Sequence, residues 1–173
     1  MELFAGSQWE LVIRLTVAVF LGLLVGAERS RVGKRAGMRT YALVSLGAAL
    51  FVIIAGAVSY QYADTFVFDP LRVASQVVVG IGFLGAGMIF VNKSDVVNGL
   101  TTAAGIWVTA AVGVACGYGL YVLAAYVTFL TLAIFEVFWY VEERFIRTSR
   151  TGIEKDFVAS ARRPRSHEDK ESA

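Results

Sequence analysis

The sequence predicts an all-α, polytopic membrane protein. We expect a bundle of five transmembrane helices with the N-terminus outside and the C-terminus inside. The chain of 173 residues is 57% hydrophobic with a mean hydropathy of +0.63, above the ~45–50% apolar content of soluble domains. It also contains five apolar stretches close to the ~20 residues that a helix needs to cross a bilayer. Finally, its Lys and Arg residues gather in the connections expected on one side of the membrane.

Polar connections separate the five apolar stretches. The first stretch contains Arg14, about a turn and a half inside its boundary, and we expect this side chain to snorkel to the lipid headgroups. Pro70, a residue favoured in the first turn of a helix, directly precedes the third. The predicted helices are approximately Trp9–Ala27, Thr40–Tyr60, Leu71–Val91, Leu100–Cys116 and Leu120–Tyr140.

The connection between the first two helices sets the expected orientation. Cytoplasmic loops of membrane proteins carry an excess of Lys and Arg, so this connection should be cytoplasmic. The next connection contains Asp64 and Asp69 and has no Lys or Arg before Arg72, as expected of the outer side. The cations of the first connection are Arg29, Arg31, Lys34, Arg35 and Arg39.

The domain organisation follows from where the apolar sequence ends. Residues 1–150 should form one transmembrane domain, and the polar, mixed-charge residues 151–173 should form a disordered cytoplasmic tail. The N-terminus has no basic segment before its apolar run, so a cleaved signal peptide is not expected. The net charge of +2 gives no reason to expect nucleic acid as a partner, and the lipid bilayer is the expected environment.

Glycine-rich sequence marks the helices expected to pack most tightly. In lipid, small residues let helix backbones approach closely, which replaces the hydrophobic driving force available in water. We therefore expect the third and fourth helices to form the inner pair of the bundle. Gly22 and Gly26, four residues apart on the first helix, suit packing within the chain or a homo-oligomer equally. The glycines of the third helix are Gly80, Gly82, Gly85 and Gly87.

Two clusters of polar residues are expected at the membrane boundaries. In one interpretation Glu28 pairs with Arg29 or Arg39, Arg72 anchors its helix at the interface, and two threonines cap the fourth helix. In the other, each cluster lines a pocket. The outer cluster is Arg72 with Gln76, four residues apart and therefore on one helix face. The cytoplasmic cluster is Glu28, Arg39, Thr40, Asn98, Thr101 and Thr102.

Little in the sequence favours enzymatic chemistry. It offers no paired carboxylates and no nucleophile with a neighbouring base, so we expect neither an enzyme nor a bound cofactor. Magnesium sites commonly use one or two carboxylates plus water, and Glu28 is then the best candidate ligand, with magnesium as a substrate or signal. The run from Gly80 to Gly87 contains GxGxxG, but a dinucleotide site would need a strand before it.

These motifs together resemble the MgtC/SapB family of membrane proteins, over roughly residues 10 to 140. The resemblance rests on Glu28-Arg29, on Arg39-Thr40 preceded by Ala-Gly, and on Arg72 followed by Gln76. It also rests on the run GIGFLGAG and on GLTTAA at the start of the fourth helix. The chain looks like the short, SapB-like form without a C-terminal soluble domain. Many members have a basic residue at the position of Asn98.

The resemblance implies a multi-pass protein of the bacterial inner membrane with a role in magnesium homeostasis. It implies two hypotheses for function. In the first, the protein regulates other membrane proteins by direct contact, notably the F-type ATP synthase, under magnesium limitation or during virulence. The alternative is a component of a transporter for magnesium or another small solute. The small-residue helix faces favour the regulator.

Overall fold

The computed structural model describes residues 8–61, 69–91, 97–141 and 144. The described residues form five helices that are long and apolar enough to cross a membrane, which confirms the all-α, polytopic fold. The predicted tail over 151–173 and Asp64 lie outside the described residues, and the membrane orientation stays a prediction. The helices are α1 (Gln8–Arg31), α2 (Met38–Gln61), α3 (Pro70–Met88), α4 (Leu100–Gly117) and α5 (Tyr121–Val141).

The chain divides into two compact units, residues 1–132 and residues 133–173. The boundary falls within α5. The first unit contains α1 to α4 and the first part of α5, and the fold described below is that of this unit. Of the second unit, the structure describes the remainder of α5 and Arg144.

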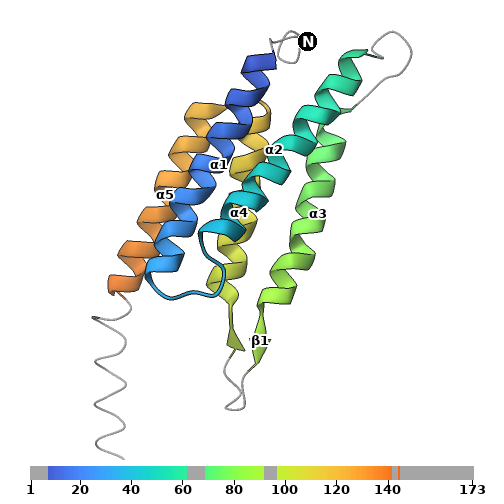
Figure 1. The fold of residues 1–173 in the computed structure, drawn as a ribbon. Helices are drawn as coiled ribbons and strands as arrows, with labels where there is room; N and C mark the ends of the chain where they lie inside the picture. The colour runs from blue at the N-terminus through green and yellow to red at the C-terminus, as the bar shows by residue number, and fades with distance from the viewer. Residues whose placement is uncertain (1–7, 62–68, 92–96, 142–143, 145–173) are drawn as a thin grey trace, which may run out of the picture. The chain divides into compact units, whose positions relative to one another are not determined.

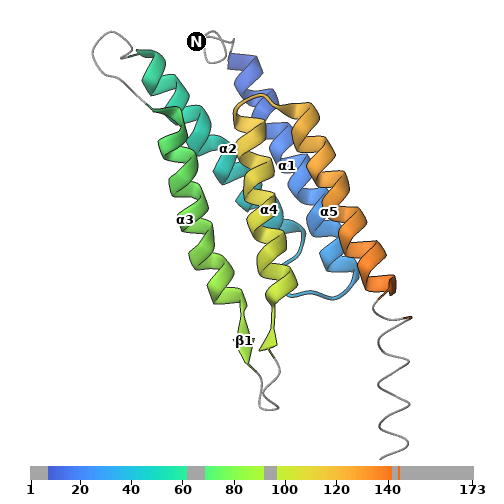
Figure 2. The same ribbon diagram turned by 180° about the vertical axis from the view of Figure 1, so that it is seen from behind.

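Three helices of the first unit pack closely on one another. α2 contacts α1, α3 and α4, and α4 in turn contacts α1 and α3 (Figures 1 and 2). Because the five helices are apolar on nearly all sides, small side chains rather than an amphipathic stripe decide which faces meet. The centre of the packing is a cluster of buried residues: Ala18, Leu21, Ala49, Val112, Cys116 and Ala124.

Glycines on α1 and α4 bring both helices against the backbone of α2. A Cβ atom at Gly22 would lie 2.8 Å from the backbone oxygen of Tyr41, and one at Gly26 would lie 2.6 Å from the Cα of Met38. On α4, a Cβ at Gly113 would lie only 2.2 Å from the backbone oxygen of Ser45, which is also on α2. Real Cβ atoms do not approach so closely, so these positions accept only glycine at the present helix separations.

The expected central position of the third helix is wrong. Only 6% of the apolar span of α3 is buried within the chain, against 56% for α4. A Cβ atom built on Gly80, Gly82 or Gly87 would meet no atom within 4 Å. These glycines therefore do not pack against the described part of this chain. Gly85 faces α4, where its Cβ would lie 3.8 Å from that of Ala103.

The third helix also ends earlier than expected. It stops at Met88, and the next residues form strand β1 (Phe90–Val91), which pairs antiparallel with β2 (Val97–Asn98). Aromatic and β-branched residues such as these favour extended backbone. Gly99 then begins α4 with a φ of 92°, a conformation that glycine adopts readily. A Cβ there would lie 2.0 Å from the backbone oxygen of Met88, so both geometry and space require glycine.

Gly113→Ala should destabilise the bundle strongly. The added methyl cannot fit beside Ser45, so α2 and α4 must separate, at a cost of about 3 kcal/mol or more. Thermal unfolding in detergent, followed by circular dichroism, measures the effect. Gly47→Ala is the matched control on α2, because a Cβ at Gly47 meets no atom within 4 Å. Equal melting temperatures for the two variants would contradict the close packing described above.

Candidate functional site

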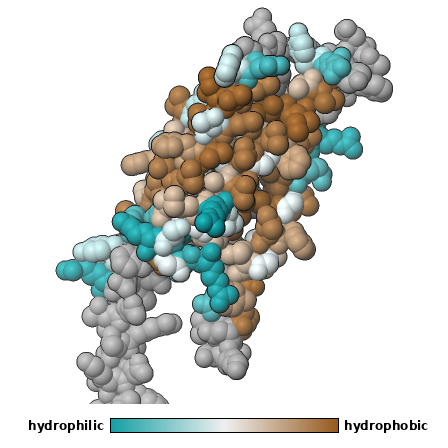
Figure 3. Space-filling view, in the orientation of Figure 1, coloured by the Kyte–Doolittle hydropathy of each residue, from teal (hydrophilic) through white to brown (hydrophobic). Residues whose placement is uncertain are grey.

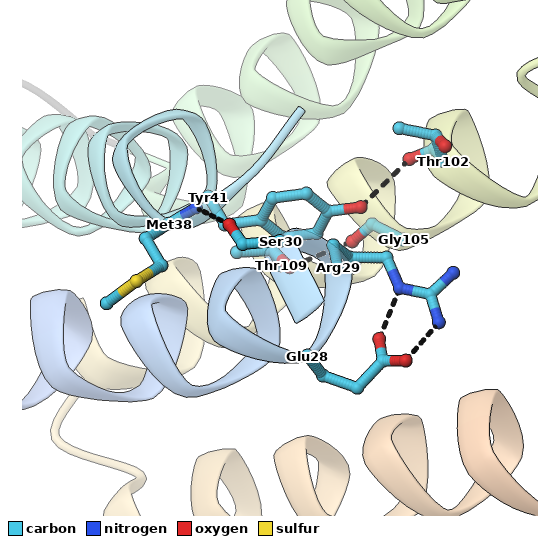
Figure 4. A network of polar contacts seen from close by, with 8 residues as sticks. All are labelled: Glu28, Arg29, Ser30, Met38, Tyr41, Thr102, Gly105 and Thr109. Atoms are coloured by element: carbon cyan, nitrogen blue, oxygen red, sulfur yellow. Dashed lines mark hydrogen bonds and ion pairs between the residues drawn. The ribbon is translucent and has the colours of Figure 1, made fainter. Parts of the chain in front are cut away.

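A buried ion pair lies at the end of α1. The carboxylate of Glu28 accepts two hydrogen bonds from the guanidinium of its neighbour Arg29 (Figure 4). One comes from Nε, and the other comes from Nη2 at a distance of 2.6 Å. Glu28 is 8% exposed and Arg29 is 4% exposed. Removing either partner would leave a buried charge uncompensated, which is costly. Of the two pairings that the sequence left open for Glu28, the structure shows the one with Arg29.

Two further hydrogen bonds tie neighbouring segments together around this pair. The hydroxyl of Tyr41 on α2 donates to the backbone oxygen of Thr102 on α4, at 3.3 Å. The backbone nitrogen of Met38 donates to the hydroxyl of Ser30 at 3.2 Å, which joins the start of α2 to the end of α1 (Figure 4). The ends of three helices are thus held together by polar contacts as well as by close packing.

Most of the remaining residues of the predicted cytoplasmic cluster are less buried than Glu28. Arg39, Thr40 and Thr101 are exposed, and Asn98 is half-buried in β2. The expectation that threonines cap α4 is wrong, because the N-cap is Gly99 and no side chain caps that end. Thr102 is buried, and its backbone oxygen rather than its hydroxyl accepts the bond from Tyr41.

A groove runs between α2 and α3. It has a volume of about 730 Å³, and its walls are mainly apolar. Arg39 and Thr40 from the predicted cytoplasmic cluster lie along it, and so does Gln76 from the predicted outer cluster. The structure therefore joins members of the two clusters through one groove. Figure 3 shows that α2 and α3 present a hydrophobic surface along their middle, consistent with contact with lipid.

The outer cluster contributes a single side chain to this groove. Arg72 is exposed in the first turn of α3, which begins at the N-cap Asp69, whose side chain accepts a hydrogen bond from the backbone nitrogen of Leu71 at 2.9 Å. Burial, and to a lesser extent the carboxylate of Asp69, raise the pKa of Tyr118 beyond α4.

The snorkelling expected for Arg14 is wrong. Its side chain is 1% exposed, donates from Nη1 to the backbone oxygen of Gly117 at 2.9 Å, and forms an ion pair with Glu10. The last carbonyls of a helix lack partners within the helix and carry partial negative charge. A cation at the end of α4 meets both needs, so Arg14 fastens α1 to α4 instead of reaching the headgroups.

Metal binding receives little support from the described residues. They contain no group of three or more His, Cys, Asp or Glu side chains placed to hold a metal ion. Both carboxylate oxygens of Glu28 already bond to Arg29. Glu28 could bind a cation only if this buried pair opened, which leaves its candidacy as a metal ligand a prediction.

Comparison with known proteins gives consistent matches over the helical part of the chain. The sequence model of the MgtC family matches residues 15–144. YhiD of Escherichia coli strain K12 is 46% identical over 134 residues, which are 75% of this chain and 60% of YhiD. MgtC of Brucella abortus strain 2308 is 48% identical over 120 residues, 69% of this chain and 48% of that protein.

A third relative matches over more of its own length. SrpB of Synechococcus elongatus is 40% identical over 134 residues, which are 73% of this chain and 74% of SrpB. No solved structure matches the chain. The chain thus spans about half to three quarters of the length of these three relatives.

Arg29→Gln should destabilise the protein by roughly 3–5 kcal/mol, because it leaves the Glu28 carboxylate buried without its cation. Adding Glu28→Gln to the same chain should restore much of the stability, since no buried charge then remains. Unfolding in detergent of the two single variants and the double variant measures this coupling. Lys34→Gln, at an exposed cation of the adjoining connection, is the control. Additive effects of the two substitutions would show that the pair is not coupled.

Proposed function

We propose, from the premise that this chain belongs to the MgtC family, that it is a membrane protein of magnesium homeostasis. We propose further that it acts as a regulator through direct contacts with other membrane proteins. The link to magnesium is supported by the name of its relative YhiD, "putative magnesium transporter". The chain covers 60% of that relative, so the activity of the whole protein is part of the proposal.

The observation that carries the regulator hypothesis is a face of α3 that the other described residues leave exposed. Gly82 and Ala86 are four residues apart, and two large side chains on the same face are highly exposed, Val79 at 68% and Phe83 at 82%. The spacing of these four residues places them on one side of a helix. We call Val79, Gly82, Phe83 and Ala86 the free face of α3. A small-xxx-small pair beside exposed apolar side chains is the kind of surface on which a second transmembrane helix packs.

The F-type ATP synthase is the partner that we propose, as the family resemblance implies. Its membrane sector presents apolar helices in the bacterial inner membrane, where we place this protein. Contact through the free face of α3 would require no rearrangement of α1, α2 and α4. This is consistent with regulation, since a peripheral helix can bind a partner without disturbing the tightly packed helices.

Transport of magnesium is the alternative, and the groove supports it weakly. The walls of the groove are mainly apolar, and its charged side chain is that of Arg39, a cation. A divalent cation there would meet repulsion rather than ligands. Glu28, the candidate magnesium ligand, has its charge balanced by Arg29.

Gly82→Leu should lower recovery of purified F-type ATP synthase on the immobilised protein by about tenfold, because a large side chain holds the partner helix away. Gly47→Leu is the matched control, since both glycines have no atom within 4 Å of a built Cβ and both variants should fold. We expect Gly47→Leu to recover as much synthase as the native chain. Equal recovery by the two variants would contradict binding through the free face.

Magnesium flux into proteoliposomes separates the two functions. A regulator should give no flux above that of empty vesicles, with circular dichroism confirming that the protein is folded. Flux that is present in the native chain and lost in Glu28→Gln would overturn the regulator proposal and place Glu28 on a transport path. The matched variant for this experiment is the double variant with Glu28→Gln and Arg29→Gln, which removes the same carboxylate without leaving the charge of Arg29 buried alone.

A further inference from the structure

We propose that the groove between α2 and α3 binds one acyl chain of an acidic phospholipid, with the lipid phosphate at Arg39. This inference concerns a different surface from the free face of α3 and does not depend on the regulator hypothesis. It rests on four observations: the glycines in both walls of the groove, the cation at one of its ends, its length, and the contact between the two helices that form its walls.

The groove exists because each of its two walls contains a glycine, which has no side chain to fill the space. Gly47 on α2 and Gly80 on α3 line it, and a Cβ atom built on either would meet nothing within 4 Å. The neighbouring wall residues Leu43, Phe51 and Leu84 are apolar and largely exposed. In a membrane a lipid-facing volume of about 730 Å³ does not stay empty. Its apolar walls suit a hydrocarbon chain, which gains dispersion contacts with them.

The charge lies at one end of the groove. Arg39 and Thr40, at the start of α2, are the exposed polar residues there. Arg35, in the connection before α2, lies over the ring of Phe90 with its guanidinium 5.0 Å from the ring centre. Since β1 directly follows α3, this contact holds a second cation beside the same end of α3. The guanidinium of Arg39 and the hydroxyl of Thr40, at the mouth of an apolar groove, complement a phosphate attached to a hydrocarbon chain.

The length of the groove fits one leaflet of a bilayer. Along α2 the lining runs from Arg39 to Phe51, which is about 18 Å of helix at 1.5 Å per residue. Half of a typical hydrocarbon core is about 15 Å thick. With the phosphate at Arg39, an acyl chain would therefore reach along the apolar wall to about the middle of the membrane. The far end, where Gln76 lies on α3, would not need to be filled.

The contact between α2 and α3 argues against a protein helix as the occupant of the groove. α2 and α3 contact one another, so the groove is the furrow between two touching helices. A transmembrane helix is about 10–12 Å across with its side chains and would rest on such a furrow rather than enter it. An acyl chain is narrow enough to lie between the two walls.

The test compares lipids with the same chains and different headgroups. Purified, delipidated protein is mixed with dioleoyl-phosphatidylglycerol or dioleoyl-phosphatidylcholine, and bound lipid is counted by native mass spectrometry. We expect phosphatidylglycerol to bind roughly fivefold more tightly, as one favourable contact with a cation provides. Arg39→Gln should remove this preference and leave phosphatidylcholine binding unchanged, whereas Arg39→Lys should keep it. Gly47→Leu should weaken binding of both lipids by filling the groove.

Two controls keep the result specific. Lys34→Gln removes a cation that does not line the groove, and Gly82→Leu changes the free face of α3, so neither should alter lipid binding. Equal binding of the two lipids by the native chain would overturn the proposal, as would unchanged phosphatidylglycerol binding in both Arg39→Gln and Gly47→Leu. The proposal would also be overturned if the native protein were a dimer and Gly47→Leu made it a monomer. In that case a second copy of the protein would occupy the groove. Because Gly47→Leu should leave synthase recovery intact, failure of this proposal is distinguishable from failure of the regulator.

Discussion

The contact between Gly113 and the backbone of Ser45 is the constraint on which the rest of the bundle depends. It fixes α4 against α2 at a separation where even a methyl group does not fit. Gly22 and Gly26 impose the same condition on α1 where it packs against α2. In lipid no hydrophobic force draws helices together, so this close packing supplies the attraction that a soluble core would obtain from water.

The polar interactions of the bundle follow from this packing. Because α2 lies so close to α4, the hydroxyl of Tyr41 reaches the backbone of Thr102. α1 also packs on α4, and the guanidinium of Arg14 reaches the backbone oxygen of Gly117. The Glu28–Arg29 pair is buried at the end of α1. Charges that would be costly in isolation are thereby placed where a partner is within reach.

α3 differs from the other helices because it is largely outside this constraint. Gly80, Gly82 and Gly87 leave space instead of permitting contact, and this space produces two separate surfaces. Gly80 contributes to the groove facing α2, while Gly82 lies on the free face that points away from the bundle. In our two proposals such a helix binds a lipid on one side and a protein on the other.

The sequence by itself determined the membrane class, the number of spans and their approximate bounds, because apolar length and flanking charge are local properties. It could not decide which glycines make contact. The tertiary structure shows that Gly22, Gly26, Gly113 and Gly117 lie at close helix contacts, whereas a Cβ at Gly80 or Gly87 would meet nothing within 4 Å. The sequence does not contain this difference, since a glycine permits close approach without specifying a neighbour. The burial of Arg14 was likewise decided by the end of α4, whose carbonyl lies 103 residues away in sequence. Contacts over such distances depend on how the helices are arranged in space, which the local pattern does not contain.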